Sequence, residues 1–376
     1  MILRELSLTS FRNIASAELC FSSKINCFLG DNGMGKSNLL DALYFMSFCR
    51  SFTGAQDAML VRRGDGFTML RGRYFRRGLD EEVTAAVQPG RPKTFKRGGK
   101  AYKRLAGHIG AFPLVLLSPA DMNLVGGEPA ERRRFIDQII SQRDPAYLDA
   151  LIRYNHALEQ RNKLLKMECA DSGLYDALEA QLEVAGDYIA ARRRENIEKL
   201  GSIFLPFYRA IADCDETPAL VYATKDYTAD GGLAAHLRHA RSRDAVLKYT
   251  SSGPHRDDIE FVLDGMPVRR SASQGQTKTF TSALRFAQYE LLHRSLGVKP
   301  LLLLDDIFDK LDAGRVRRIM AIVGSTESFG QIFITDTNRR HLDEIVADIP
   351  TEAGPDTCRL WHVENGVFTL VATDRP

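Results

Sequence analysis

A glycine-rich loop that follows an apolar run most constrains how this chain of 376 residues folds. Residues 30–37 read GDNGMGKS and fit the pattern G-x-x-x-x-G-K-[ST], directly after the apolar stretch INCFL. Residues 37–48, SNLLDALYFMSF, have the apolar spacing of a mostly buried helix. Backbone N–H groups of such a loop cradle phosphate oxygens, and the helix start adds the positive end of its dipole. The sequence therefore predicts a strand, a phosphate-binding loop and a helix.

The loop also carries side chains suited to a nucleoside triphosphate. Lys36 is expected to reach the β and γ phosphates, and the Ser37 hydroxyl to bind Mg²⁺. A second apolar run, the four leucines at 301–304, ends in Asp305 and Asp306. Such a run predicts a strand covered on both faces of a parallel α/β sheet, whose carboxyl end is where these sheets bind ligands. Asp305 is predicted to hold the metal, and Asp306 to polarise the attacking water.

A third element begins with small polar residues, SASQGQ at 271–276, and continues as an amphipathic helix. Its apolar stripe consists of Phe280, Leu284, Ala287 and Leu291. Ser273 and Gly275 at the helix start form a second anion site. One nucleotide can contact both the glycine-rich loop and this second anion site in two ways. Either the chain folds so that the two sites meet, or two subunits pair head to tail. The second arrangement is the more economical, and it places Ser273 of one subunit at the γ-phosphate held by Lys36 of the other.

The order of these motifs resembles that of ABC-type ATPases of the SMC-like DNA-repair branch. Residues 30–37, 272–276, 301–306 and 309–312 look like the Walker A, signature, Walker B and D-loop motifs. Further stretches are similar to the bacterial RecF family: FRNI at 11–14, LLSPADMNLVGGEPAERRRFID at 116–137, GPHRDD at 253–258 and SQGQ at 273–276. Because the resemblance runs nearly end to end, the chain is identified as a member of that family.

The resemblance implies an α/β fold: an ABC-type ATPase head, with mixed and parallel sheets and helices, into which an α-helical arm is inserted. The expected domains are 1–118, the N-terminal part of the head with Walker A; 119–206, the arm; and 207–376, the C-terminal part of the head. The arm has a coiled-coil-like seam of two heptads at Tyr175, Leu178, Leu182, Ala185 and Ile189. SMC and related tethering ATPases carry a much longer coiled coil.

The resemblance also implies a set of site residues. The nucleotide-binding residues are Arg12, Asn13, Gly30, Asp31, Asn32, Gly33, Met34, Gly35, Lys36, Ser37 and Asn38, and the Mg²⁺ ligands are Ser37 and Asp305. Ser273, Gly275 and Gln276 are the signature residues that act in trans, and Asp312 is the D-loop aspartate. Asp306 stands where transporter-type ABC ATPases usually have a longer Glu, which fits a slow, switch-like ATPase. The residue at the switch position near Asp336 and Thr337 and the Q-loop residue are left open.

The family further implies what the chain does. RecF proteins dimerise on ATP, bind duplex DNA and duplex to single-strand junctions, and work with RecR and RecO. They help RecA load at gaps in recombinational repair and replication-fork recovery. The expected activity is a weak, DNA-stimulated ATPase whose hydrolysis resets the clamp. The alternative is another SMC-like ABC ATPase acting as a nucleotide-gated DNA scaffold, in which Asp306 contributes little turnover.

Charge is uneven along the chain. Residues 91–104, RPKTFKRGGKAYKR, carry seven Lys or Arg and no acid. Such a run is either a solvated hairpin face or a contact to the phosphate backbone. The candidate DNA-binding residues are Lys96, Arg97, Lys100, Lys103 and Arg104. No apolar run is long enough to cross a bilayer, so we expect a cytoplasmic protein without a membrane partner. The scattered cysteines indicate neither a zinc site nor a disulfide framework.

Overall fold

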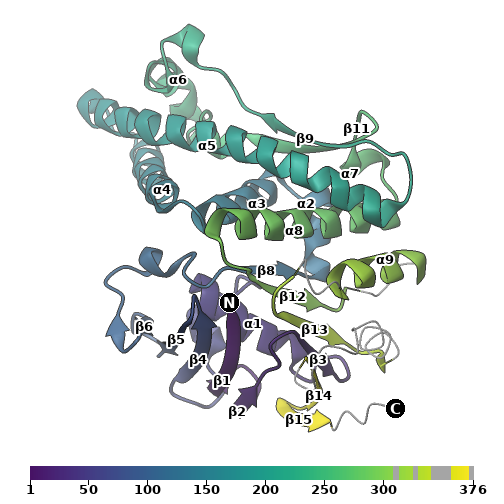
Figure 1. The fold of residues 1–376 in the computed structure, drawn as a ribbon. Coiled ribbons are helices and arrows are strands. Elements are labelled where there is room, and N and C mark those ends of the chain that lie inside the picture. Colours follow the sequence, from purple (N-terminus) through teal and green to yellow (C-terminus); the bar gives the residue numbers. More distant parts are fainter. Residues whose placement is uncertain (308–312, 325–328, 340–356, 372–376) are drawn as a thin grey trace. The chain divides into compact units, whose positions relative to one another are not determined.

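The computed structural model describes residues 1–307, 313–324, 329–339 and 357–371, and Figure 1 shows the course of the chain. The chain divides into two compact units. The first comprises Met1–Asp121, Ala210–Asp213 and Lys278–Pro376, and the second comprises Met122–Arg209 and Cys214–Thr277. Residues 214–277, which the resemblance assigns to the ATPase head, therefore form one compact unit with the helical insertion. The functional division at 118 and 206 stays a prediction.

An antiparallel sheet in the first unit has the strand order β2-β1-β4-β5-β6-β7. Its strands are β1 (Ile2–Phe11), β2 (Ile14–Cys20), β4 (Thr68–Arg76), β5 (Leu79–Val87), β6 (Thr94–Arg97) and β7 (Lys100–Ala101). Buried and exposed residues alternate along β4, as expected for a sheet with one face on the core. The basic run at 91–104 contains the β6–β7 hairpin of this sheet.

A second sheet of the first unit has the order β15-β14-β3-β13-β12-β8. Its strands are β3 (Ile25–Leu29), β8 (Leu114–Leu117), β12 (Leu301–Asp305), β13 (Ile332–Asp336), β14 (Cys358–Glu364) and β15 (Val367–Val371). All neighbouring pairs are parallel except β14 with β15. The four leucines of β12 are fully buried between β13 and β8, which confirms the predicted doubly covered strand. The carboxyl ends of β3, β13 and β12 consequently lie along one edge of the sheet.

Helix α1 (Lys36–Phe48) lies between the two sheets and contacts strands of both (Figure 1). The two sheets and this helix share one apolar core. The helix is buried almost all round, because the predicted apolar spacing leaves few polar positions. Other long helices with residues in this unit are α8 (Gln274–Leu296), which begins in the second unit, α9 (Ala313–Gly324) and the last residues of α5 (Ser172–Ala212). The predicted stripe of α8, from Phe280 to Leu291, is buried.

The second unit is mainly helical. Its helices are α2 (Met122–Gly126), α3 (Pro129–Ser141), α4 (Pro145–Lys166), α5 (Ser172–Ala212, ending in the first unit), α6 (Leu233–Leu247) and α7 (Val268–Ser271). A small antiparallel sheet of order β11-β10-β9 completes it, with β9 (Pro218–Ala223), β10 (Asp258–Leu263) and β11 (Met266–Pro267). The predicted seam of α5 is buried at all five positions. In the part of the chain that is described, no helix is long and apolar enough to cross a membrane.

Candidate nucleotide site

The glycine-rich loop joins the end of β3 to the start of α1. Gly33 has φ 81° and Gly35 has φ 116°, a backbone region that residues with a Cβ rarely adopt. At Gly30 a glycine is needed for lack of space, because a Cβ there would lie 2.2 Å from the carbonyl oxygen of Val363. The loop therefore needs glycine for its conformation at two positions and for close packing at the third. Its turns resemble the concave N–H arrangements that bind anions.

Lys36 is the first residue of α1, and its side chain folds back over the loop. Its Nζ donates to the carbonyl oxygen of Gly30 at 2.5 Å and to that of Asp31 at 2.9 Å. Burial lowers the pKa of Lys36, whereas the carboxylates of Asp306, Asp305, Asp31 and Asp336 raise it. The ammonium is thus held beside the loop, where a phosphate chain would require a cation.

Ser37 and Asp305 come together at the end of the parallel sheet. The Ser37 Oγ donates to Oδ1 of Asp305 at 2.9 Å, and the Thr335 Oγ1 donates to the same oxygen at 2.7 Å. Burial raises the pKa of Asp305, and the two hydroxyl donors and the charge of Lys36 lower it. A hydroxyl and a carboxylate within hydrogen-bond distance are oxygen ligands of the kind Mg²⁺ prefers, so this pair fits the implied metal.

Two further carboxylates lie at the same sheet edge. Asp306 follows β12 with φ 48°, and its N–H donates to the carbonyl oxygen of Thr335 at 3.2 Å. Asp336 ends β13, is buried, and accepts a hydrogen bond from the N–H of Asn338 at 2.7 Å. Asp306 is the carboxylate with the largest effect on the pKa of Lys36. The sheet edge therefore concentrates negative charge around Lys36. A bound metal ion and a triphosphate would change the net charge there.

Arg12 and Asn13 follow β1 and flank the loop. The Arg12 Nη2 lies 2.5 Å from Oδ2 of Asp41 on α1, and it donates to Thr53 Oγ1 at 2.9 Å. The Asn13 Nδ2 donates to the carbonyl oxygen of Met34 at 3.3 Å. The Asn13 Oδ1 accepts from the amide of Asn38 at 2.8 Å. Asn13 therefore contacts the loop directly, whereas the guanidinium of Arg12 is fixed by α1.

The signature residues lie in the second unit, at the start of α8. The Ser273 Oγ accepts from the N–H of Gln276 at 3.1 Å, and the Gln276 Oε1 accepts from the N–H of Ser273 at 2.7 Å. This reciprocal pair is a capping box, which fixes the first turn of a helix. The Gln276 Nε2 also donates to Oε1 of Glu216 at 2.7 Å. Ser273 is exposed and Gly275 lies within the fixed turn. The D-loop residue Asp312 lies outside the described residues.

The basic hairpin β6–β7 presents its cations to solvent. Lys96, Arg97, Lys100, Lys103 and Arg104 are all exposed. The Arg97 Nε lies 2.7 Å from Oε2 of Glu81, and this hydrogen bond raises the pKa of the guanidinium. The register pairs Lys96 with Ala101 and Arg97 with Lys100. The hairpin is thus a dense, exposed positive segment, and Glu81 is an acidic partner of Arg97 within it.

Several contacts around these sites have no signal in the local sequence. Asp41, which pairs with Arg12, lies in the helix pattern as an ordinary polar residue. Thr335 donates to Asp305 only because β12 and β13 are neighbours. The turn at Asn365 and Gly366 does have a signal, because Asn-Gly between alternating residues predicts a tight hairpin turn. The N–H of Gly366 donates to the carbonyl oxygen of Met34 at 2.8 Å, and nothing in the sequence indicates that partner.

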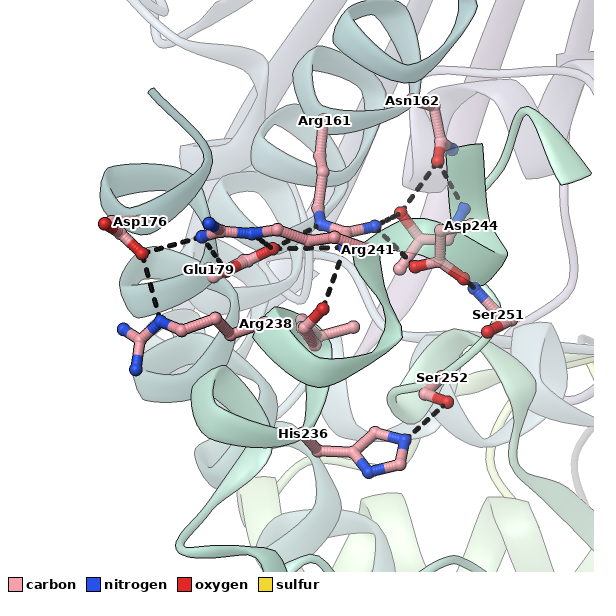
Figure 2. Close-up of polar contacts among 12 residues, drawn as sticks. Arg161, Asn162, Asp176, Glu179, His236, Arg238, Arg241, Asp244, Ser251 and Ser252 are labelled. Carbon is pink, nitrogen blue, oxygen red and sulfur yellow. Dashed lines mark hydrogen bonds and ion pairs between the residues drawn. The ribbon is translucent and has the colours of Figure 1, made fainter. Parts of the chain in front are cut away.

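A buried ion network in the second unit was likewise not predicted (Figure 2). The Arg161 side chain on α4 is fully buried, as are those of its partners Glu179 on α5 and Asp244 on α6. Its Nη1 lies 2.7 Å from Oδ2 of Asp244, and its Nη2 lies 3.1 Å from Oε1 of Glu179. The Nη1 also donates to Thr250 Oγ1 at 2.9 Å. One arginine thus joins three helices and the segment that leads into GPHRDD.

The GPHRDD segment itself is held by hydrogen bonds within the second unit. His255 lies in the short helix η5 (Pro254–Arg256), with its Nδ1 2.6 Å from the Tyr154 hydroxyl and its Nε2 3.0 Å from the carbonyl oxygen of Thr250. Burial lowers the pKa of His255 to about 4. Asp258 forms two hydrogen bonds with Arg132, at 2.8 and 2.9 Å. Both ring nitrogens of His255 are therefore engaged in holding the segment in place.

Comparison with known proteins agrees with this geometry. Residues 1–65 match the model of the AAA ATPase domain family. The chain is 46% identical to the DNA replication and repair protein RecF of Parabacteroides distasonis, over 92% of this chain and 94% of that protein. It is 45% identical to the protein of the same name from Porphyromonas gingivalis, over 97% and 99%. The corresponding Bacteroides fragilis protein is 44% identical over 98% of each.

Solved structures give the same result. A structure of the recombination mediator protein RecF with ATP in the RecFOR pathway matches with a TM-score of 0.86 and 28% identity, over 99% of this chain and 98% of that one. An Smc head domain derived from Pyrococcus furiosus shares the fold, with a TM-score of 0.57 and 18% identity over 98% and 96%. The predicted α/β ABC-type head is confirmed. On its similarity to these relatives over nearly its whole length, the chain belongs to the RecF family of DNA replication and repair proteins, which are ATP-binding ABC-type ATPases.

Proposed function

We propose that this RecF-family ATPase is a nucleotide-gated clamp that dimerises on DNA when ATP binds. The observation that carries the proposal is the contact of Ser37 with Asp305, because it joins the phosphate loop to the carboxyl end of β12 as a metal-binding pair. Loop, lysine, hydroxyl and carboxylate are all within the first unit. The exposed Ser273 and its capped helix lie in the second unit.

In the proposed site, backbone N–H groups of Gly33 to Lys36 bind the phosphate oxygens and the Lys36 ammonium neutralises the β and γ phosphates. Bound Mg²⁺ supplies charge neutralisation and orientation of the triphosphate, and Ser37 and Asp305 would hold it. Asp306 accepts the proton of the attacking water. Its side chain is shorter than Glu, so the base reaches the water less well and turnover is slow. A slow ATPase suits a clamp that ATP closes and hydrolysis opens.

The second half of the nucleotide site comes from the partner subunit in this proposal. Ser273, Gly275 and Gln276 surround a helix N-terminus whose first turn is fixed by the capping box. A helix N-terminus attracts anions because its N–H groups and dipole present positive potential. The exposed position of Ser273 supports contact with a γ-phosphate outside its own chain. ATP then joins two subunits, and Asp312 is proposed to contribute as the D-loop residue.

The proposed DNA ligand of the clamp is duplex DNA or a junction between duplex and single-stranded DNA. The exposed cations of the β6–β7 hairpin support a phosphate-backbone contact. RecR, with RecO and RecA, is proposed as the partner set, because a matching structure is described as the recombination mediator protein RecF of the RecFOR pathway. The clamp would mark the junction at which RecA is loaded.

Two variants test the chemistry of the site. Lys36→Ala removes the cation at the phosphates and is expected to abolish ATP binding, measured by equilibrium titration. Asp306→Asn keeps the loop and is expected to bind ATP normally while hydrolysis falls by roughly 100-fold or more, the size expected for loss of a general base. Wild-type hydrolysis by Asp306→Asn would remove the base role and leave the nucleotide-gated scaffold as the better description. Wild-type ATP binding by Lys36→Ala would place the nucleotide elsewhere.

A further inference from the structure

The hairpin formed by β14 and β15 ends in a two-residue turn at Asn365 and Gly366. Their φ angles are 49° and 80°, and both being positive is the mark of the type I′ turns that connect tight hairpins. The hairpin register continues up to the turn, with Glu364 paired to Val367. The turn is therefore a defined structure whose position follows from the strands that carry it.

The sheet places this turn beside the glycine-rich loop. β14 runs parallel to β3, with His362 opposite Leu29, the last residue before the loop. The two strands are also joined by side chains, since the rings of Phe28 and Trp361 stack with centroids 6.4 Å apart. One residue further along, a Cβ at Gly30 would lie 2.2 Å from the carbonyl oxygen of Val363. The backbones of the loop and of β14 are thus in direct contact.

The turn also binds the middle of the loop. The N–H of Gly366 donates to the carbonyl oxygen of Met34 at 2.8 Å, and the Asn13 Nδ2 donates to the same oxygen at 3.3 Å. A Cβ at Gly366 would lie 2.5 Å from the carbonyl oxygen of Asn13. A Cβ at Gly35 would lie 2.9 Å from the side-chain Nδ2 of Asn13. The hairpin turn and the Asn13 segment therefore hold one carbonyl of the loop between them.

Fixing that carbonyl has a consequence for the N–H that follows it. The C=O and N–H of a planar trans peptide point in opposite directions. When the Met34 carbonyl is held toward Gly366, the N–H of Gly35 in the same peptide is directed away from the hairpin. We propose that the turn at Asn365 and Gly366 is a positioning element for ATP, which keeps the Gly35 N–H turned toward the phosphates. This inference rests on the proposed function, because it takes the loop as the ATP site.

A second hairpin of this chain offers a matched control. The β10–β11 turn consists of Asp264 and Gly265, with φ angles of 49° and 78° that match those of the turn at 365–366. A Cβ at Gly265 has no atom within 4 Å. Gly265→Ala and Gly366→Ala therefore impose the same backbone strain, and only Gly366→Ala adds an atom against the Asn13 backbone. The difference between the two variants measures the contact with the loop.

The experiment is an equilibrium titration of each full-length variant with ATP and Mg²⁺, at a temperature below every melting transition. Gly366→Ala is expected to raise the Kd for ATP at least about 10-fold over Gly265→Ala, which matches about 1.4 kcal/mol. The melting temperature is expected to fall in both variants, and further in Gly366→Ala, because only there does the added Cβ meet the Asn13 backbone. A Kd for Gly366→Ala within twofold of the Gly265→Ala value would overturn the inference, because a merely structural turn would change the melting temperature alone.

Two additions keep the outcome decisive. If Gly366→Ala does not accumulate as folded protein, Asn365→Ala weakens the turn without adding an atom at Gly366, and it is expected to raise the Kd roughly threefold. An unchanged Kd for Asn365→Ala would then overturn the inference.

Lys36→Ala in the same titration distinguishes failure of the positioning role from failure of the proposed nucleotide site. If Lys36→Ala loses ATP binding and Gly366→Ala binds ATP normally, only the positioning role is overturned. If Lys36→Ala also binds ATP normally, the proposed nucleotide site is overturned as well.

Discussion

The Ser37 Oγ donates to Oδ1 of Asp305 at 2.9 Å, although the two residues are 268 positions apart in the chain. The contact exists because β13 pairs with both β3 and β12, so that the loop after β3 and the carboxylate that ends β12 meet at one sheet edge. The pair that we propose to hold the metal is thus brought together by sheet topology.

Asp305→Asn is predicted to stabilise the protein at neutral pH while removing its activity. The pKa of Asp305 is raised in the folded protein, mainly by burial, so the native state binds this proton more tightly than the unfolded state does. The free energy of unfolding therefore falls as pH rises from the unfolded pKa through the folded one. Asn keeps an oxygen that accepts from Ser37 and Thr335 but carries no charge. We expect a higher melting temperature at pH 7.5, and a loss of Mg²⁺-dependent hydrolysis of roughly 100-fold.

The pH series provides the check on that explanation. The melting temperatures of wild type and Asp305→Asn should converge as the pH is lowered toward the unfolded pKa of an aspartate, because both side chains are then neutral. A variant that is less stable than wild type at pH 7.5 would show that the charge interaction with Lys36 outweighs the cost of burying the carboxylate.

Neutralising the basic hairpin is predicted to weaken the salt dependence of DNA binding. Lys96→Gln with Lys100→Gln removes two exposed cations, and each phosphate contact contributes about one to the slope of log affinity against log salt. The slope measured on duplex DNA should fall by roughly two. Lys163→Gln with Lys166→Gln on α4 changes the net charge equally and serves as the control. An unchanged slope in the hairpin variant would place the DNA contact elsewhere.

His255 is predicted to make the second unit sensitive to acid. Its pKa is lowered to about 4 by burial, aided by the charges of Arg256 and Arg133, while Asp244 and the hydrogen bond to Thr250 oppose the shift. The native state holds the ring neutral, so protonation of the unfolded chain below about pH 6.5 favours unfolding. The free energy of unfolding should fall by up to roughly 3 kcal/mol between pH 6.5 and 4 from this residue alone. Urea denaturation of His255→Gln over the same range should show a smaller fall, and an equal fall would assign the acid sensitivity to other groups.

Removal of Arg161 is predicted to be among the most destabilising changes in the second unit. Arg161→Ala removes the buried cation that contacts Asp244 and leaves the buried Glu179 with Arg241, and breaking a buried ion pair in this way costs about 3 to 5 kcal/mol. Arg238→Ala breaks an exposed pair with Asp176 and should cost far less, because exposed ion pairs contribute little to stability (Figure 2). Urea denaturation of both variants measures the difference. Similar losses would mean that the Arg161 network contributes no more than a surface pair.

The elements that carry the nucleotide site were predictable because each has a strong local pattern. The loop at 30–37 requires glycine, and the leucines before Asp305 specify a buried strand. The stripe of α8 and the seam of α5 follow helical spacing in the same way. These patterns are local, so they do not depend on knowing which strands become neighbours.

The remaining contacts depend on strand order and helix packing, which no local pattern encodes. Thr335 reaches Asp305 because β13 pairs with β12, and Gly366 reaches Met34 because β14 pairs with β3. Arg161 looks like one more surface cation on α4 until its two carboxylates are located on other helices. That residues 214–277 form one compact unit with an insertion that precedes them in the chain is also set by tertiary packing, and no local pattern indicates it.

We propose that ATP joins two subunits, with Lys36 of one and Ser273 of the other at the same nucleotide. The most direct measurement is sedimentation velocity of the purified protein with ATP and Mg²⁺, with and without duplex DNA, beside Lys36→Met and Ser273→Arg. We expect an ATP-dependent shift from monomer to a DNA-binding dimer in the wild type and no shift in either variant, although Ser273→Arg still binds ATP. Dimers of Ser273→Arg that persist in ATP, or ATP hydrolysis by a wild-type monomer, would show that Ser273 does not complete the site in trans.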